Sequence, residues 1–306
     1  MSNAAFAVQP AVHALEIHPV AGRIGAEIRG VQLSGELDAA TVEAIQQALL
    51  QYKVIFFREQ TQLDDQRQEA FAHLLGEPVA HPTVPVREGT RVLLELGGAE
   101  GQRASSWHTD VTFVEAYPKA SILRSVVAPA FGGDTLWANT ATAYSGLSEE
   151  LRELADKLVA VHSNEYDYAG VRPDVSAEKL ERYRKIFTST VYETEHPVVR
   201  VHPISGEKSL LLGHFVKRIK GYSQADSAHL FGLLQSHVIR QENIVRWRWK
   251  AGDVAIWDNR STQHYAVDDY GTQDRIVRRV TLKGEVAVGV NGQVSQTVKG
   301  PDIGGV

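Results

Sequence analysis

Apolar positions in the first quarter of the chain follow a helical period in two places. Residues 37–52 (LDAATVEAIQQALLQY) place Val42, Ile45 and Leu49 at helical spacing, after Asp38 as a suitable N-cap. Residues 63–76 (LDDQRQEAFAHLLG) predict a second helix that ends at a glycine. The continuous apolar run KVIFF between them predicts a short buried strand.

From about residue 91 onward the pattern becomes strand-like. Short apolar runs alternate with glycine turns, among them Gly132-Gly133 and Gly252. Two helical stretches, 147–160 and 223–239, interrupt this pattern. Many short strands with flanking helices predict a mainly β fold, a β-barrel or double-sheet jelly roll.

One long stretch does not fit the strand pattern. Residues 163–195 are polar and charged, with few positions suited to a core. Long insertions of this kind in compact domains are often lids over a site. We therefore expect a single domain over residues 1–306, with a lid-like insertion around 163–195.

Composition narrows the possible partners. The chain has 306 residues, 43% of them hydrophobic, which is ample for a buried core, and its net charge of −5 argues against nucleic acid as a partner. It has no cysteine, which excludes disulfides, thiolate metal sites and a cysteine nucleophile. No apolar run approaches the roughly 20 residues needed to cross a membrane, and the N-terminal residues lack the features of a signal peptide. We expect a cytoplasmic protein that acts on a small molecule.

The stretch SSWHTDVTF (105–113) raises the first chemical question. His108 and Asp110 stand two residues apart, and on a strand both side chains would face the same way. Such a pair alone is more often structural than a metal site. His264, in AIWDNRSTQHYAV (255–267), is the best candidate for a third ligand. Two histidines and one carboxylate on a barrel form the facial triad of non-heme Fe(II) oxygenases.

The segment RIVRRVTL (275–282) alternates in the manner of a strand. Arg275 and Arg279 would then share a face, about 13 Å apart at about 3.3 Å per residue. This is too far to bind one small anion together, so the pattern indicates two anion sites. The alternative interpretation is a basic edge strand that faces solvent.

These residues resemble the motif of the Fe(II)/2-oxoglutarate-dependent dioxygenases, in the taurine dioxygenase superfamily. The resemblance covers nearly the whole chain and rests on GAEIRGVQL, WHTDVTF, GGDTLWANT, HPVVRVHPISG and VRWRWKAGDVAIWDNRSTQHYAVDDY. It implies a double-stranded β-helix, with Fe(II), 2-oxoglutarate and O₂ as cofactor and cosubstrates. By this resemblance His108, Asp110 and His264 bind iron, Arg275 and Thr135 bind 2-oxoglutarate, and His81, Arg279 and the backbone N–H of Val111 hold a sulfur oxyanion.

The sequence departs from the taurine enzymes at two positions. Val84 stands where they have a tyrosine, and Ala104 stands where they have an asparagine. The pocket keeps its anion-binding residues but loses polar partners for the ammonium of taurine. In this respect the chain is most similar to the alkylsulfatase branch, whose members cleave alkyl sulfate esters to aldehyde and sulfate, with succinate and CO₂ as coproducts.

Three other interpretations stay open. Within the family, the chain could be a taurine or other sulfonate dioxygenase. In a different class, His/His/Asp could bind zinc in a sulfate ester hydrolase, which would need neither Arg275 nor O₂. A non-catalytic jelly-roll binding module would explain the barrel but not the spacing of triad and arginines. We also expect a homo-oligomer.

Aromatic residues receive simpler interpretations. Trp107 and Phe113 are either dry walls of the site or plain core packing. The other tryptophans are interpreted as packing residues: Trp137, Trp247, Trp249 and Trp257.

Overall fold

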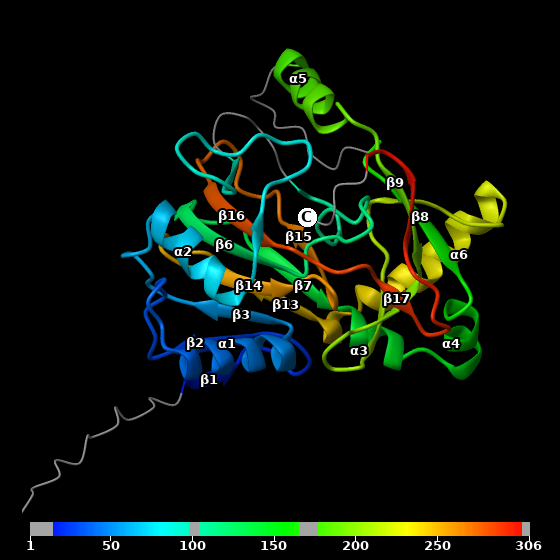
Figure 1. Cartoon of the computed structure of the whole chain (residues 1–306), viewed down its shortest axis with the longest axis horizontal. Helices are drawn as coiled ribbons and strands as arrows, with labels where there is room; N and C mark the ends of the chain where they lie inside the picture. Colours follow the sequence, from blue (N-terminus) through cyan, green and yellow to red (C-terminus); the bar gives the residue numbers. More distant parts are fainter. Residues whose placement is uncertain (1–14, 98–103, 166–176, 302–306) are drawn as a thin grey trace, which may run out of the picture.

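A large, mostly antiparallel sheet forms one half of the protein (Figure 1). The structure is a computed structural model that describes residues 15–97, 104–165 and 177–301. The sheet has eight strands, in the order β1-β2-β3-β14-β6-β16-β4, with β5 also paired to β16. Their bounds are β1 Glu16–Pro19, β2 Ala26–Arg29, β3 Val54–Phe57, β4 Pro78–Val79, β5 Leu94–Gly97, β6 Ala120–Val127, β14 Val254–Asp258 and β16 Ile276–Leu282.

Three smaller sheets complete the β structure. One, in the order β13-β7-β15, packs against the inner face of the large sheet; the others are β12-β8-β9-β18 and β11-β10-β17. Their bounds are β7 Thr135–Asn139, β8 Val159–Ser163, β9 Glu193–Pro197, β10 Val199–Val201, β11 Lys208–Leu210, β12 Val216–Ile219, β13 Ile244–Trp247, β15 Thr262–Ala266, β17 Val288–Gly289 and β18 Gln296–Lys299.

Strand β14 shows why apolar runs without alternation lie at the centre of this fold. All five of its residues are buried. Val254 and Ile256 belong to the core under helices α1 and α2, whereas Ala255 and Trp257 belong to the core between the two sheets. Because successive side chains point to opposite faces, a strand buried on both faces needs apolar residues throughout.

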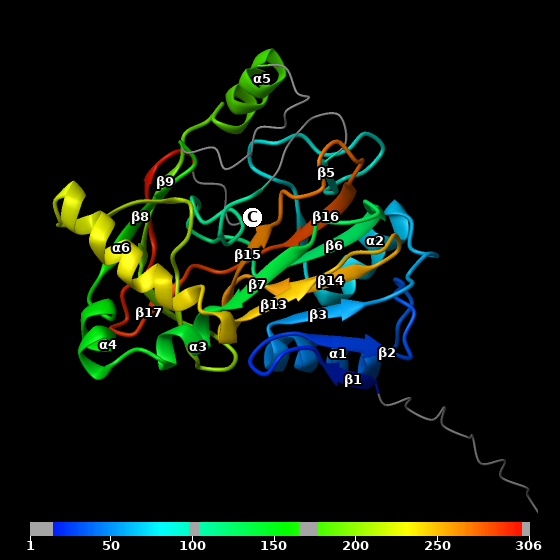
Figure 2. The same ribbon diagram turned by 180° about the vertical axis from the view of Figure 1, so that it is seen from behind.

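Helices cover the outside of the sheets. α1 and α2 lie on the outer face of the large sheet. α3, α4 and α6 pack around the smaller sheets, on the side of the molecule away from α1 and α2 (Figure 2). The helices are α1 Ala39–Tyr52, α2 Asp65–Leu75, α3 Thr140–Ser145, α4 Glu149–Ala155, α5 Ala177–Phe187 and α6 Gln224–Val238. No helix in the described ranges is long and apolar enough to span a membrane.

The sequence predicted most of these elements. Asp38 caps α1 by accepting the backbone N–H of Thr41 at 2.9 Å, as its position suggested. The helix predicted over 147–160 is shorter, because α4 ends at Ala155 and β8 begins at Val159. α3 was not predicted, since six residues are too few to show a helical period. The mainly β jelly-roll class is confirmed.

The predicted insertion is more anchored than its composition indicated. β8 includes Ser163 and β9 begins at Glu193, so the ends of the 163–195 stretch belong to a sheet. Between them, α5 stands at the top of the molecule in both ribbon views (Figures 1 and 2). Its last residue, Phe187, is fully buried and ties the end of α5 to the core. Residues 166–176 lie outside the described residues.

Candidate active site

Two segments far apart in sequence bring His108 and His264 together. His264 lies on β15, and His108 forms a single antiparallel bridge to it. The backbone N–H of His108 donates to the carbonyl of His264 at 3.0 Å, and the reverse bond is 2.8 Å long. This reciprocal pair fixes the two imidazoles with their ring centroids 4.1 Å apart.

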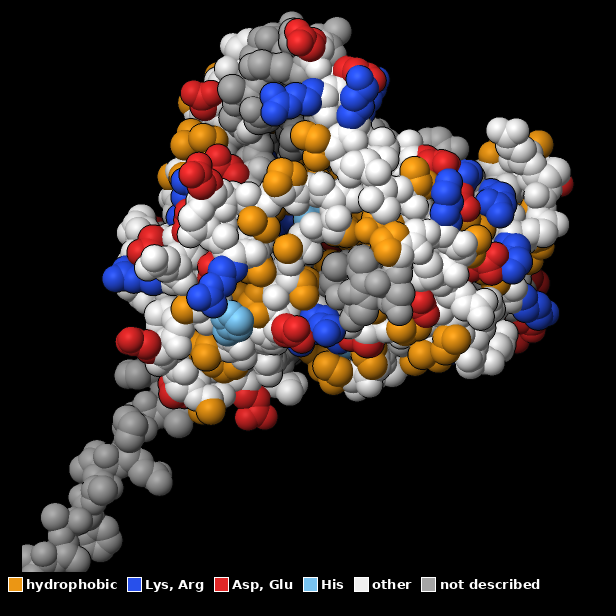
Figure 3. All heavy atoms as spheres, turned by 45° about the horizontal axis from the view of Figure 1, so that its top comes forward, with side chains coloured by type: hydrophobic (Ala, Val, Ile, Leu, Met, Phe, Trp, Pro, Cys, Tyr) orange, Lys and Arg blue, Asp and Glu red, His pale blue; other side chains and the backbone are white. Residues whose placement is uncertain are grey.

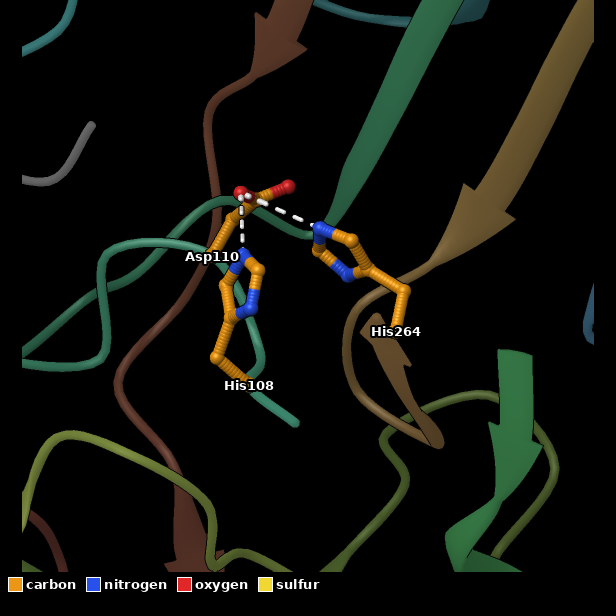
Figure 4. Close-up of side chains that lie close together, drawn as sticks. All are labelled: His108, Asp110 and His264. Carbon is orange, nitrogen blue, oxygen red and sulfur yellow. Dashed lines mark ion pairs between the residues drawn. The ribbon is translucent and has the colours of Figure 1, made fainter. Parts of the chain in front are cut away.

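Asp110 completes the cluster, but not from a strand. The expectation that His108 and Asp110 share a strand face is wrong, because the chain enters a turn at Asp110. The turn points the carboxylate back at the imidazoles, as Figure 4 shows. Asp110 Oδ1 lies 4.0 Å from Nε2 of His108 and 3.8 Å from Nε2 of His264. One ligand atom from each residue lies within 4.8 Å of the others, and all three residues are buried.

The protonation states of this cluster suit a metal ion. Nδ1 of His108 lies 2.7 Å from the carbonyl of Ser106, which can only accept, so Nδ1 carries the proton and the lone pair of Nε2 faces the site. Burial lowers the pKa of His108 to about 4 and that of His264 well below its usual value. Burial would raise the pKa of Asp110, but Arg279 and the imidazoles hold it below its usual range. Two neutral imidazoles and one carboxylate are a fitting donor set for Fe(II) or Zn²⁺.

A chain of hydrogen bonds fixes the Asp110 carboxylate. Its Oδ2 accepts the hydroxyl of Ser121 at 2.6 Å, Ser121 accepts the amide of Asn259 at 3.0 Å, and Asn259 accepts the indole N–H of Trp257 at 2.9 Å. The Trp257 ring also packs on His264, with centroids 4.8 Å apart. With Oδ2 occupied, Oδ1 is the oxygen that faces the histidines. Trp257 therefore packs in the core, as expected, and also supports this chain of hydrogen bonds.

Two further donors lie beside the cluster. Arg279, buried on β16, donates from Nη1 to Asp110 Oδ1. Nδ1 of His81 accepts the backbone N–H groups of Thr83 at 3.2 Å and Val84 at 3.0 Å, so Nε2 of its neutral ring carries the proton. Dense packing around His81 and the charge of Arg279 lower its pKa to about 3. Both side chains thus present N–H groups near the triad.

Arg275 and Thr135 form a separate buried pair. Arg275 Nε donates to the carbonyl of Gly133 at 3.0 Å, and its Nη2 donates to the hydroxyl of Thr135 at 3.4 Å. Gly133 has φ +68°, and a Cβ there would lie 3.1 Å from Cδ of Arg275, so the close approach of the loop favours glycine. The alternation predicted for this strand is correct: Arg278 faces outward to Asp65, while Arg275 and Arg279 are buried.

Trp249 adds a contact that the sequence did not indicate. Its indole N–H donates to Thr135 Oγ1 at 2.9 Å, in addition to the core packing expected for Trp249. By contrast, the indole nitrogens of Trp137 and Trp247 have no hydrogen-bond partner within the described parts of the chain. Together with Trp257, these tryptophans all belong to the core between the two sheets, so the packing interpretation is confirmed for each of the four.

An apolar cluster borders the triad. It contains Val111, Phe113 and Phe187, and Val84 packs against it. Phe113 therefore lies where a dry wall is needed, whereas Trp107 packs on a different core beside α6. In the space-filling view, hydrophobic side chains surround a small hollow below α5, with histidine visible inside it (Figure 3).

The turn that carries Asp110 is strained. Val111 has φ +58°, a conformation that β-branched residues rarely adopt and that occurs mainly at functional sites. The next residue, Thr112, is held by two buried histidines: its hydroxyl lies 2.9 Å from Nδ1 of His162, and its carbonyl accepts Nε2–H of His196 at 2.7 Å. Ala104 lies near the same site, where its carbonyl accepts the N–H of Ala266 at 3.1 Å.

Sequence reasoning missed the residues that support the site rather than form it. These are Ser121, Asn259, Trp249 and Trp257, which act through side-chain hydrogen bonds to their neighbours. Asn259 and Trp257 stand in the same quoted stretch as His264, and that proximity was the only available signal.

Comparison with known proteins identifies the family. Residues 16–281 match the family described as taurine catabolism dioxygenase TauD, TfdA family. The chain is 78% identical over 299 residues to an alpha-ketoglutarate-dependent sulfate ester dioxygenase of Pseudomonas putida, covering 98% of this chain and 99% of that one. It is 59% identical over 296 residues to an alkylsulfatase of Acinetobacter baylyi, covering 97% and 93%.

A solved structure agrees with this assignment. The crystal structure of a taurine dioxygenase from Burkholderia xenovorans superposes with a TM-score of 0.80 at 39% identity, over 95% of this chain and 97% of that one. The family match covers most of the chain, including all three residues of the triad. The protein is therefore a member of the TauD/TfdA family of dioxygenases.

Proposed function

We propose that this enzyme uses Fe(II), 2-oxoglutarate and O₂ to cleave alkyl sulfate esters to an aldehyde and sulfate, with succinate and CO₂ as coproducts. The observation that carries the proposal is the arrangement of donors around the triad. Arg275 is buried beside Thr135, and Arg279 is buried beside Asp110. An apolar cluster borders the Asp110 side. The names of the two relatives with 78% and 59% identity support the same substrate class.

In this proposal His108, Asp110 and His264 hold the iron through Nε2, Oδ1 and Nε2. The iron supplies the activation of O₂, coupled to oxidative decarboxylation of 2-oxoglutarate. The bond from Ser121 to Asp110 Oδ2 keeps the carboxylate in one orientation. The burial of all three residues keeps the imidazoles neutral and ready to bind metal at neutral pH.

Arg275 and Thr135 bind the distal carboxylate of 2-oxoglutarate. A guanidinium donates two parallel N–H groups, which match the two oxygens of a carboxylate. Arg275 is held by the carbonyl of Gly133 and is 8% exposed, so its charge acts in a region with little water. A dicarboxylate such as 2-oxoglutarate could then bind Arg275 and Thr135 with one end and reach the triad with the other.

His81, Arg279 and the N–H of Val111 bind the sulfate group. In the neutral ring of His81 the Nε2–H is a donor, and Arg279 adds a positive charge. The left-handed conformation of Val111 turns its backbone beside Asp110 and so brings the head group next to the metal. Val84 and Phe113 then line the path of the alkyl tail.

This chain's part in the reaction is to place one carbon and to keep water away. Binding the sulfate beside Asp110 presents the carbon that bears the ester oxygen to the oxidant. One C–H bond of that carbon is replaced by a C–OH bond, with the oxygen atom taken from O₂. The resulting hemiacetal sulfate loses its hydroxyl proton and expels the sulfate, which breaks the C–O bond to sulfur's oxygen and leaves the aldehyde. The aromatic cluster of Phe113, Phe187 and Phe215 excludes water from the tail side and limits unproductive oxidation.

We also propose that the segment around α5 is a lid over this pocket. Phe187, at the end of α5, packs against Phe113 and lies 6.0 Å from the ring of His81, so movement of α5 would open or close the tail side. The remaining parts of the proposal are a cytoplasmic location and a homo-oligomeric state, the latter to be measured by light scattering.

The decisive experiment measures stoichiometry. With hexyl sulfate as substrate, we expect equal amounts of succinate, sulfate and consumed O₂. Release of sulfate without O₂ would favour a zinc hydrolase instead. The same assay with taurine tests the sulfonate dioxygenase alternative, which predicts sulfite release at a comparable rate.

A further inference from the structure

The hydroxyl of Thr135 receives hydrogen bonds from two donors. The indole N–H of Trp249 reaches Oγ1 at 2.9 Å, and Nη2 of Arg275 reaches the same atom at 3.4 Å. A threonine hydroxyl has two acceptor lone pairs and one proton. Neither an indole N–H nor a guanidinium can accept a hydrogen bond, so both contacts use the lone pairs of Oγ1.

The proton of Thr135 must therefore point to a third group. No acceptor for it occurs in the described parts of the chain, although Thr135 is only 3% exposed. A buried hydroxyl proton without a partner is costly, so a bound ligand is the natural acceptor. Because Arg275 stands beside the hydroxyl, a carboxylate oxygen of the ligand fits this position best.

We propose that Trp249 is a positioning residue for 2-oxoglutarate, which acts by fixing the hydroxyl of Thr135 as a donor. The inference rests on the proposed function, in which Thr135 and Arg275 bind this cosubstrate. Without the indole N–H, one lone pair of Oγ1 is released and the hydroxyl can rotate away from the carboxylate.

The surroundings of Trp249 make it a rigid donor. The side chain is 5% exposed, and its ring lies 6.2 Å from that of Trp137. It follows β13 by two residues, and Trp247 at the end of β13 pairs with Thr135 across the sheet. The indole therefore lies just beyond a strand whose register with the strand of Thr135 is fixed.

The first test replaces Trp249 with phenylalanine, which keeps an aromatic ring and removes the N–H. We expect 2-oxoglutarate to bind Mn(II)-loaded protein about three- to tenfold more weakly by calorimetry, the scale of one lost neutral hydrogen bond. The KM for hexyl sulfate should stay unchanged. Trp247→Phe is the matched control, since Trp247 is equally buried on the same strand end and its indole N–H has no partner among the described residues.

A double-mutant cycle separates positioning from packing. In a Thr135→Val background, Trp249→Phe should cause no further loss of 2-oxoglutarate affinity, because the hydroxyl through which Trp249 acts is absent. Thr135→Ser should restore near-normal affinity. Additive losses in the cycle would mean that Trp249 acts through packing, and would overturn the inference.

A second readout does not depend on the folding of Trp249→Phe. The chain has five tryptophans, so the Zn(II) form should show five indole N–H signals by NMR. Thr135→Val should shift one of these signals strongly, and 2-oxoglutarate should shift the same one in the wild type. No shift in either case contradicts the inference. If Arg275→Ala and Thr135→Val leave 2-oxoglutarate binding intact, the proposed cosubstrate site itself is wrong.

Discussion

Two carboxylates in this protein have nearly the same neighbours and serve different ends. Asp110 and Asp258 are each 1% exposed, and each lies with a histidine and an arginine. At Asp258, Arg260 donates to both oxygens, at 2.9 and 2.7 Å, and His202 Nε2 donates to one of them at 3.0 Å. Every strong acceptor position of that carboxylate is in use.

The histidines at the two carboxylates also differ in their hydrogen bonds. Nδ1 of His202 accepts backbone N–H groups from Ile204 and Ser205, so the Asp258 cluster is closed by hydrogen bonds on all sides. At Asp110, both imidazole Nε2 atoms stop at 3.8 Å or more from the carboxylate, beyond hydrogen-bond distance. The lesson is that His, Asp and Arg together do not define a metal site. A metal site also requires that the lone pairs of the imidazoles and the carboxylate face one another without a hydrogen bond between them.

The largest expected effect is the loss of metal from the Asp110 cluster but not from variants of the Asp258 cluster. His108→Ala, Asp110→Ala and His264→Ala should each lose iron and all measurable turnover, because two remaining ligands hold the ion weakly. Asp258→Asn should keep its iron but lose about 3–5 kcal/mol of stability, since it removes the carboxylate that Arg260 contacts through two hydrogen bonds and leaves only Glu285, 3.7 Å away, as its charge partner. Metal analysis and urea unfolding measure both outcomes. Wild-type iron content in the triad variants would contradict the assignment.

The next effect depends on the apolar cluster that borders Asp110 but not Asp258. Medium-chain alkyl sulfates should exceed taurine by several orders of magnitude in kcat/KM. An unpaired ammonium near Val84 and Ala104 costs several kcal/mol, whereas each buried methylene gains about 0.8 kcal/mol. Val84→Tyr combined with Ala104→Asn should narrow the difference. Equal consumption of 2-oxoglutarate with taurine and hexyl sulfate would reverse this conclusion.

A third prediction compares the arginines. Arg279→Ala should raise the KM for the sulfate ester about 10- to 100-fold, and Arg275→Ala should do the same for 2-oxoglutarate, the scale of a charge-assisted hydrogen bond. Arg260→Ala should change neither KM and instead lower stability. Steady-state kinetics with each substrate varied in turn gives the result. Equal effects of Arg275→Ala and Arg279→Ala on both substrates would refute the division of roles.

The surroundings of Asp110 and of Asp258 should also lose folding stability at different pH values. Burial lowers the pKa of His196, which supports the Asp110 turn, from 6.5 to about 4. Between these values the unfolded chain binds a proton that the folded chain does not, so stability falls as pH falls, by about 1.4 kcal/mol per pH unit. The loss across this window is about 3 kcal/mol for His196, and His196→Gln should remove it.

The Asp258 side responds at lower pH. The pKa of its carboxyl is held below 3.8, against the effect of burial, by Arg260 and His202, so its contribution is lost only as pH falls below that value. Urea midpoints of the metal-free protein at a series of pH values test both windows. A pH dependence of His196→Gln identical to that of the wild type would show that other groups carry the acid response.

The smallest expected effect concerns α5. Iron, 2-oxoglutarate and hexyl sulfate together should slow tryptic cleavage within α5 a few-fold, because Phe187 would be held against a filled pocket. Cleavage elsewhere should not change. Identical digestion with and without the ligands counts against a lid.

Prediction from the sequence was most accurate where chemistry follows local spacing. Arg275 and Arg279 were placed on one face by the alternation of the sequence, and both are buried, although β16 begins only at Ile276. His108 and Asp110 were selected as a pair, but for a strand that the chain does not form. The contact between Arg279 and Asp110 was not predicted, because the sequence gives no sign of which carboxylate a buried arginine reaches.

The sequence by itself determined most of the helices and strands and the residue types of the site, because periods of about 3.6 and 2 residues arise from local backbone geometry. Only the tertiary structure decided which cluster stays open. The pairing of His108 with His264 and the turn at Asp110 depend on strands distant in sequence, as does the bond from Trp249 to Thr135. The packing of distant segments holds Nε2 of His264 3.8 Å from Asp110, whereas Arg260 and His202 both hydrogen-bond to Asp258.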